Sequence, residues 1–161
     1  MIFVSVGMMN YPFTRLLSKM NEIAPLLGEE VVMQVGASND TFENTTYKKF
    51  FDADKMTELY DQCSVLVCHA GVGTILNGVE RNIPVVMVPR KADFNEVDND
   101  HQIMIADQIV ATGRGIKVMD VDNLYDSILA ARRLKFSEYE ENKSLVNFLI
   151  VLLADLEKRK K

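Results

Sequence analysis

Two glycines separated by one residue follow an apolar segment near the middle of the chain and precede a helical pattern. The run Ser64-Val65-Leu66-Val67-Cys68 is typical of a buried strand, and residues 73–81 are typical of a helix. The connection between them, residues 69–74, would direct unpaired main-chain N–H groups and the positive end of the helix dipole toward one point. His69 and Thr74 add side chains that can donate to phosphate oxygens. The pattern predicts a phosphate site, although a tight turn without a ligand would use the same glycines.

A second polar segment follows the next predicted strand. Residues 89–102 are rich in charged and amide side chains and end in Asp100-His101-Gln102, where a helix is expected to begin. Asp100 can cap that helix, which would explain it without a ligand. Alternatively, Asp100 and Gln102 can each bridge neighbouring hydroxyl groups of a sugar. Arg90 in the same segment suits either an anion or a solvated surface position.

Apolar segments alternate with helical patterns along the chain, which indicates how these residues are positioned. The expected strands are 2–6, 30–36, 49–51, 64–68, 84–88 and 115–118, and the expected helices are 11–27, 54–62, 73–81, 100–113, 121–134 and 137–158. Strands that are apolar throughout and separated by helices are typical of a parallel sheet covered on both faces. We therefore expect an α/β fold with a Rossmann-like, doubly wound parallel sheet, which binds ligands at the carboxyl ends of its strands.

The turn after the first strand lacks the glycine pattern of dinucleotide-binding proteins. It reads Val6-Gly7-Met8-Met9-Asn10-Tyr11-Pro12, and the chain also lacks the Gly-x-x-x-x-Gly-Lys-Ser/Thr pattern of P-loop proteins. The predicted phosphate site therefore follows the fourth strand instead of the first. This position disfavours NAD enzymes and P-loop ATPases.

Bulk properties narrow the class of protein. The 161 residues are expected to form one domain, 1–161, and a net charge of −5 argues against nucleic-acid binding. Met1 leads directly into an apolar strand, and no apolar run reaches roughly 18 residues, so we expect neither a signal peptide nor a membrane span. Cys63 and Cys68 lack metal-ligand spacing with the histidines, so reduced, buried thiols in a cytoplasmic protein without a metal site are expected.

Several segments together resemble a known family. They are Met1–Gly7, Pro12–Leu16, Gln34–Ser38, His69–Ile75, Pro84–Arg90 and Asn99–Gln102. In this order, over about residues 1–113, they resemble the C-terminal domain of glycosyltransferase family 28. Within that family the chain is similar to the stand-alone donor-binding subunits of two-component UDP-sugar transferases. These include the bacterial exopolysaccharide type and the soluble subunit of the N-glycan chitobiose-forming GlcNAc transferase.

The resemblance implies the C-terminal half of a GT-B enzyme and a role for individual residues. His69, Gly71, Gly73 and Thr74 would face the donor diphosphate, Asn77 the ribose, Asp100 and Gln102 the donor sugar, and Phe51 and Met56 the uracil, with Gly7 in the loop that faces the cleft. The UDP-sugar would be a substrate, and neither a metal nor another cofactor is implied.

Two positions depart from the family pattern. Asn77 stands where many relatives carry a glutamate that holds the ribose hydroxyls, and Glu80 is a possible substitute. Met8 follows Gly7 where a threonine is common, which removes a hydroxyl from the first loop. An asparagine can still bind a hydroxyl, but without the charge of a carboxylate.

What the resemblance implies as a whole is an inverting transferase split across two chains. This chain would bind the UDP-sugar, and a membrane-associated partner subunit would hold a lipid-linked acceptor that receives a hexose in polysaccharide biosynthesis. We expect the general base on the partner, although Asp93, Glu96 and Asp98 are nearby candidates. The apolar helix within residues 137–161 would dock either the partner or this domain's own sheet. The chain would then be cytoplasmic and recruited to the inner face of the membrane by its partner.

Two other functions stay open on the sequence. One is a non-catalytic nucleotide-sugar-binding or enhancer module of a transferase whose activity lies in the partner. The other is a free-standing Rossmann-like enzyme such as a UDP-sugar epimerase, which is disfavoured because such enzymes need a second domain. The sequence does not identify the sugar, because candidate hexoses differ by one group or one stereocentre.

Overall fold

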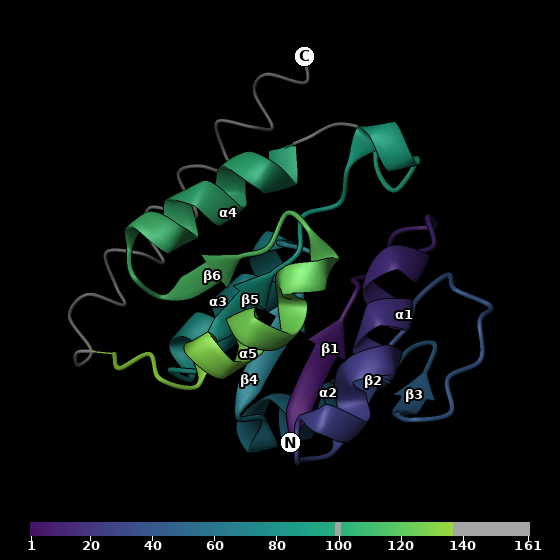
Figure 1. Cartoon of the computed structure of the whole chain (residues 1–161), viewed down its shortest axis with the longest axis horizontal. Helices are drawn as coiled ribbons and strands as arrows, with labels where there is room; N and C mark the ends of the chain where they lie inside the picture. The colour runs from purple at the N-terminus through teal and green to yellow at the C-terminus, as the bar shows by residue number, and fades with distance from the viewer. Residues whose placement is uncertain (99–100, 137–161) are drawn as a thin grey trace.

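Short apolar segments pair in parallel to form the sheet at the centre of the molecule (Figure 1). The computed structural model describes residues 1–98 and 101–136. The strands are β1 (Ile2–Ser5), β2 (Val31–Gln34), β3 (Thr46–Lys48), β4 (Val65–Cys68), β5 (Val85–Met87) and β6 (Gly115–Lys117). Within this part of the chain they form one six-stranded sheet in the order β3-β2-β1-β4-β5-β6, and every pair is parallel. The predicted Rossmann-like α/β fold is confirmed.

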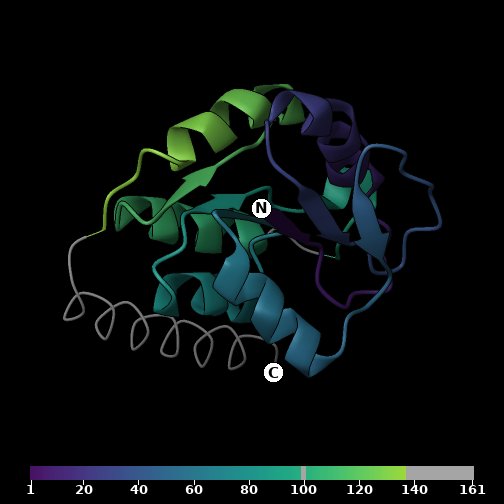
Figure 2. The ribbon, with the colours of Figure 1, turned by 90° about the horizontal axis from the view of Figure 1, so that it is seen from below.

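Helices cover both faces of the sheet. They are α1 (Thr14–Ile23), α2 (Ala53–Gln62), α3 (Val72–Glu80), α4 (His101–Ala111) and α5 (Leu124–Ala131), with 3-10 turns η1 (Ala24–Leu26), η2 (Ala92–Phe94) and η3 (Val121–Asn123). Helices α1 and α5 pack on one face, and α2, α3 and α4 pack on the other, as Figure 2 shows in a view along the layers. None of the described helices is long and apolar enough to cross a membrane.

The two cores explain why the strands are apolar throughout. Ile2 and Val4 of β1 pack toward α1 and α5, whereas Phe3 packs toward α2 and α3. In β4, Val67 and Leu66 divide in the same way. Successive strand residues point to opposite faces, so a sheet covered on both sides needs an apolar residue at every position.

The third strand lies a few residues before its predicted position. We expected it at 49–51, but Thr46–Lys48 pairs with β2, and only the carbonyl of Lys49 extends the ladder, by accepting from Gly36 N–H at 3.0 Å. All three residues of β3 are exposed, which suits a short, partly charged edge strand. Beyond it, Phe51 turns inward and packs edge-to-face against Phe3, with ring centroids 6.4 Å apart.

Two predicted helices are shorter than expected. Helix α1 begins at Thr14 instead of near residue 11, and it passes at Ala24 into a 3-10 turn that contains Pro25. Helix α5 begins at Leu124, because the Asp120 side chain accepts from Asp122 N–H and holds the preceding residues in a 3-10 turn. The predicted helix 137–158 and the candidate Asp100 lie outside the described residues.

Candidate functional site

A pocket of about 570 Å³ opens at the carboxyl ends of β1, β2 and β4, with α2 and α3 on its sides. The neighbours β1 and β4 mark the point where the strand order reverses, which is where doubly wound sheets bind ligands. The structure brings most of the predicted site residues to this pocket. They are Gly7, Phe51, Met56, His69, Gly71, Gly73, Thr74 and Asn77.

His69 lies at the end of β4 with its ring buried behind the pocket wall. Its Nδ1 is 3.2 Å from the carbonyl oxygen of Ser5 in β1. A carbonyl only accepts, so Nδ1 carries the proton and donates. Burial, together with the nearby Arg90 cation, lowers the pKa of His69 to about 4. At neutral pH the Nε2 atom is therefore unprotonated and accepts hydrogen bonds, so a contact from Nε2 to a phosphate oxygen requires the ring to gain a proton.

Two glycines lie directly against the His69 ring. A Cβ on Gly7 would lie 2.6 Å from His69 Cε1, and a Cβ on Gly71 would lie 2.2 Å from Nε2. Gly7 also adopts φ +77°, which favours glycine over other residues. Any side chain at either position would displace the ring. These glycines are required by the fold of the site itself, in addition to any ligand.

The first turn of α3 supplies main-chain donors to the pocket. The first intrahelical bond runs from Ile75 N–H to Gly71 O at 3.0 Å, so the N–H groups of residues 72–74 precede it and have no partner within the helix. Gly71 provides no side-chain cap, and the first turn holds no acidic residue. A Cβ built on Gly73 meets nothing within 4 Å. An anion can therefore approach this helix end closely.

The chain enters α3 through a residue with left-handed backbone geometry. Ala70 has φ +63° and is fully buried between His69 and the helix. This conformation costs a non-glycine residue roughly 1–2 kcal/mol, and here it turns the chain sharply out of β4. The two cysteines, one before β4 and one at its end, are free, buried thiols, as predicted, and burial raises the pKa of Cys63 and Cys68 to about 12 each. Neither is a nucleophile at neutral pH.

Asn77 lines the pocket, but its amide is engaged within α3. Its Nδ2 donates to Gly73 O at 2.8 Å, and its Oδ1 accepts from Arg81 Nη1 at 3.1 Å. Arg81 in turn pairs with Asp61 through Nε at 2.7 Å. Glu80, the other candidate for the ribose hydroxyls, is exposed and is absent from the pocket wall.

The opposite wall is aromatic and apolar, and it contains a polar residue that sequence analysis missed. Phe51 and Met56 lie here, Phe51 just before α2 and Met56 in its first turn. The Phe51 N–H donates to Oε1 of Gln34 at 3.2 Å, and Gln34 is 4% exposed. A single polar residue at the carboxyl end of the otherwise apolar run 31–34 was the signal that could have identified it. An aromatic and apolar wall beside a main-chain and amide rim suits a planar base.

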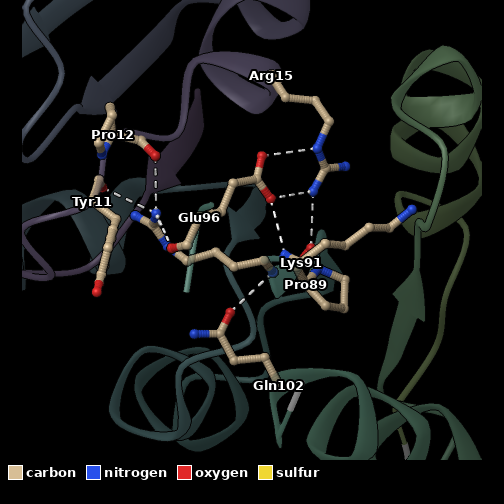
Figure 3. Close-up of polar contacts among 8 residues, drawn as sticks. Tyr11, Pro12, Arg15, Pro89, Lys91, Glu96 and Gln102 are labelled. Atoms are coloured by element: carbon tan, nitrogen blue, oxygen red, sulfur yellow. Dashed lines mark hydrogen bonds and ion pairs between the residues drawn. The ribbon is translucent and has the colours of Figure 1, made fainter. Parts of the chain in front are cut away.

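Gln102 does not line this pocket. It lies in the first turn of α4, where its Oε1 accepts from the Arg90 main-chain N–H at 3.1 Å (Figure 3). Arg90 is 0% exposed, so it is not a solvated residue. Its guanidinium donates to the main-chain carbonyls of Val6, Tyr11, Pro12 and Glu96.

Two of the three carboxylates considered as general bases accept hydrogen bonds from other side chains of the fold. Glu96 is buried and accepts from Arg15 Nε at 3.0 Å and Nη2 at 2.9 Å (Figure 3). Asp98 accepts from the Tyr11 hydroxyl at 2.6 Å, and Asp93 is exposed. Among the described residues, no carboxylate lines the pocket and no cluster of three metal-ligating side chains occurs.

Comparison with known proteins agrees with this architecture. The family model described as glycosyltransferase family 28 C-terminal domain matches residues 1–154. A search of curated protein sequences found no significant match.

Solved glycosyltransferases share the fold. The glycosyltransferase of kitacinnamycin superposes with a TM-score of 0.66 at 21% identity, over 98% of this chain and 42% of that one. The glycosyltransferase SsfS6 from Streptomyces sp. SF2575, complexed with thymidine diphosphate, gives 0.55 at 26% identity over 83% of this chain and 35% of that one. The spinosyn rhamnosyltransferase SpnG superposes with a TM-score of 0.60 at 20% identity, over 81% of this chain and 36% of that one. The chain therefore spans less than half the length of these structures.

Proposed function

The chain belongs to the glycosyltransferase family 28 C-terminal domains, and on this basis we propose that its pocket binds the nucleotide part of a UDP-sugar donor. The observation that carries the proposal is the meeting of three features at one point. The first turn of α3 offers unpaired N–H groups, the glycines beside His69 leave that helix end open, and Phe51 with Met56 forms an apolar wall. Together they suit a diphosphate attached to a planar base.

The diphosphate is assigned to the α3 terminus. Transfer of the sugar leaves a nucleoside diphosphate with additional negative charge, and preorganised N–H groups stabilise such charge without reorganisation. The main-chain donors of residues 72–74 and the Thr74 hydroxyl are the proposed contacts. We propose that no metal ion takes part.

A related structure supports the choice of a pyrimidine diphosphate. SsfS6 is complexed with thymidine diphosphate and is 26% identical to this chain over 83% of its length. Thymidine and uridine diphosphates share the pyrimidine ring and the diphosphate. The uracil is therefore assigned to the wall formed by Phe51 and Met56, beside the Gln34 side chain.

The acceptor is assigned to a partner subunit. The described pocket wall contains no carboxylate, and a His69 pKa of about 4 makes that ring a weak base at neutral pH. The pocket rim also exposes apolar side chains, with Met8 82% and Phe50 46% exposed. Both observations favour a second protein surface that closes over the donor and supplies the general base.

The finer assignments follow from the resemblance to two-component transferases. We propose that the partner is membrane-associated, that the acceptor is lipid-linked, and that the product belongs to polysaccharide biosynthesis. The chain would then work at the inner face of the membrane. Asp100 and Gln102 stay assigned to the donor sugar, which Gln102 could reach by exchanging its contact with Arg90 N–H.

Calorimetry and a transfer assay test the proposal. UDP should bind the isolated chain, and UMP should bind more weakly because it lacks the second phosphate. Transfer from a UDP-sugar should require membranes that contain the partner, and His69→Ala and Gln102→Ala should lower it. Absence of UDP binding, or full transfer by both variants, would refute the site assignment.

A second candidate is a nucleotide-sugar-binding module with no catalytic residue of its own. The same lack of a carboxylate in the described pocket wall favours it. The two candidates differ in one respect. If variants of this chain change the rate of transfer at saturating UDP-sugar, the chain takes part in the chemistry. If they change only the UDP-sugar concentration required, it acts as a binding module.

A further inference from the structure

The loop between β1 and α1 is held at both of its ends by one buried side chain. Arg90 Nη2 donates to Val6 O at 3.0 Å, at the start of the loop. Arg90 Nη1 donates to Tyr11 O at 3.0 Å and to Pro12 O at 3.2 Å, at its end. Segment 7–11 therefore begins just after one carbonyl bound by the guanidinium, Val6 O, and ends at another, Tyr11 O. A planar guanidinium can do this because its donors point in fixed, different directions.

A wider set of contacts fixes the guanidinium itself. Its Nη1 also donates to Glu96 O at 3.1 Å, and its carbon lies 4.5 Å from the Phe13 ring centroid. The Glu96 carboxylate accepts from Arg15 and from Lys91 N–H, as Figure 3 shows. The loop after β5 is thus tied to α1 and to the loop after β1.

Burial of this cation is costly, and the described residues offset the cost with main-chain carbonyls. Arg90 is fully buried, its Nε has no hydrogen-bond partner among them, and desolvation lowers its pKa to about 10. Four charge-assisted hydrogen bonds to main-chain carbonyls offset this desolvation cost, and all four fix the conformation of loops. None of them contacts a carboxylate, so the arrangement is specialised for holding main chain.

The first of the two loop ends held by Arg90 lies at the pocket. Ser5 O accepts from His69, and the next carbonyl, Val6 O, accepts from Arg90. Gly7 follows immediately and lies against the His69 ring, and both Gly7 and Met8 line the pocket. The position of the pocket wall therefore depends on a residue that does not itself line the pocket.

We propose that Arg90 is a positioning residue: by holding both ends of loop 7–11 it keeps Gly7 against the His69 ring and sets the shape of the diphosphate subsite. The loop part of this inference stands on the contacts above, whereas the diphosphate part rests on the proposed function. Arg90 acts through the loop and does not contact the ligand.

Arg114 offers a matched control for the test. It is also buried, at 4% exposure, and its Nη1 donates to Asn82 at 3.3 Å. It immediately precedes β6 and so lies at the amino ends of the strands, opposite the pocket. Arg114→Met therefore removes a buried arginine from the same fold without touching the first loop.

The experiment compares wild type, Arg90→Met, Arg90→Lys and Arg114→Met by NMR and calorimetry. In Arg90→Met, backbone order parameters of residues 7–10 should fall from about 0.85 to below about 0.6 without nucleotide. UDP affinity should fall at least tenfold. Arg90→Lys should give order parameters and a UDP affinity between those of wild type and Arg90→Met, because one ammonium group cannot span both loop ends. Arg114→Met should keep the rigid loop and bind UDP within twofold of wild type.

Each result decides the proposal. A rigid loop and unchanged UDP affinity in folded Arg90→Met would overturn it, and if that variant does not fold, the same result in Arg90→Lys would do so. In wild type, saturating UDP should shift the Arg90 Nε–H resonance, and an unshifted resonance would also count against the proposal. Failure of wild type to bind UDP would refute the proposed function, while the order parameters would still test the loop contact.

Discussion

The Nε2 atom of His69 lies 2.2 Å from the position that a Cβ atom on Gly71 would occupy. Real Cβ atoms do not approach other atoms so closely, so the ring and a side chain at residue 71 exclude each other. The ring cannot simply rotate away, because its Nδ1 is bound to Ser5 O. The geometry of the pocket floor thus depends on a glycine and a histidine that are two residues apart in sequence.

Gly71→Ala should therefore damage both stability and binding. The methyl group must push His69 off Ser5 O or shift the start of α3, and overpacking of this kind costs roughly 1–3 kcal/mol. We expect a lower urea midpoint and no measurable UDP binding by calorimetry. Wild-type stability in this variant would show that the ring moves freely, contrary to the structure.

Gly73→Ala is the informative companion, because it separates folding from binding. A Cβ on Gly73 meets nothing, and its φ is not left-handed. Alanine in a helix is about 1 kcal/mol more favourable than glycine, so the urea midpoint should rise. UDP affinity should nevertheless fall, because the methyl group occupies the space through which a phosphate reaches the helix end. A variant that is more stable and binds UDP unchanged would remove Gly73 from the proposed diphosphate site.

Stability should depend on pH through His69. Its pKa is about 4 in the folded chain and roughly 6.5 when unfolded, so between these values only the unfolded state binds the proton. The contribution of His69 is fully present above pH 6.5 and is lost as the pH falls toward 4, with a slope of up to about 1.4 kcal/mol per pH unit. Urea unfolding at pH 4.5 to 7.5 measures it.

His69→Asn provides the comparison for this slope. The variant should lose most of the pH dependence between pH 6.5 and 4.5, whereas His101→Asn should retain it. These are the only two histidines of the chain, so the pair isolates the effect. An NMR titration gives the pKa directly, and a value near 6.5 for His69 would contradict the buried, neutral ring.

Ligand binding should show the opposite dependence on pH. If Nε2 contacts a phosphate oxygen, the bound ring must carry a proton, so UDP binding takes up a proton at neutral pH. UDP affinity should then rise as the pH falls from 8 toward 6, as long as the phosphates keep their charge. Calorimetry in buffers of different ionisation enthalpy measures the proton uptake. Zero uptake would exclude a phosphate contact from His69 Nε2 and leave the α3 N–H groups and the Thr74 hydroxyl as the phosphate donors.

Local patterns predicted the fold and the α3 side of the pocket, whereas Gly7, Phe51, Met56 and Asn77 were predicted from the family resemblance. The glycines at 71 and 73 and the apolar run 64–68 are short-range signals, and they identified the strand-to-helix turn that the structure contains. The apolar strand segments predicted the parallel sheet, because burial on both faces leaves a continuous pattern. The third strand was predicted too late in the chain, at 49–51, because Phe50 and Phe51 are residue types typical of strands. In the structure Phe50 is exposed and Phe51 packs on Phe3.

Contacts between distant segments could not be predicted in this way. Arg90 meets carbonyls 78 to 84 positions earlier in the chain, and Glu96 pairs with Arg15 across 81 positions. Nothing in the composition of loop 89–98 distinguishes a buried arginine from a solvated one. The protonation state of His69 likewise follows from burial and from Ser5 O, which belongs to another strand.

Asn77 offers a test of the ribose site. Its amide is satisfied by Gly73 O and Arg81, so it has little left to offer a hydroxyl group, whereas a longer, charged glutamate could reach one. One charge-assisted hydrogen bond of roughly 1.5 kcal/mol corresponds to about a tenfold gain. We expect Asn77→Glu to bind UDP about tenfold more tightly by calorimetry, with a smaller gain for 2′-deoxyuridine diphosphate. Glu80→Gln is the control, because Glu80 is exposed outside the pocket wall and its loss should leave UDP affinity unchanged. Equal gains for both nucleotides would place residue 77 away from the 2′-hydroxyl, and weaker UDP binding in Glu80→Gln would transfer the ribose contact to that side chain.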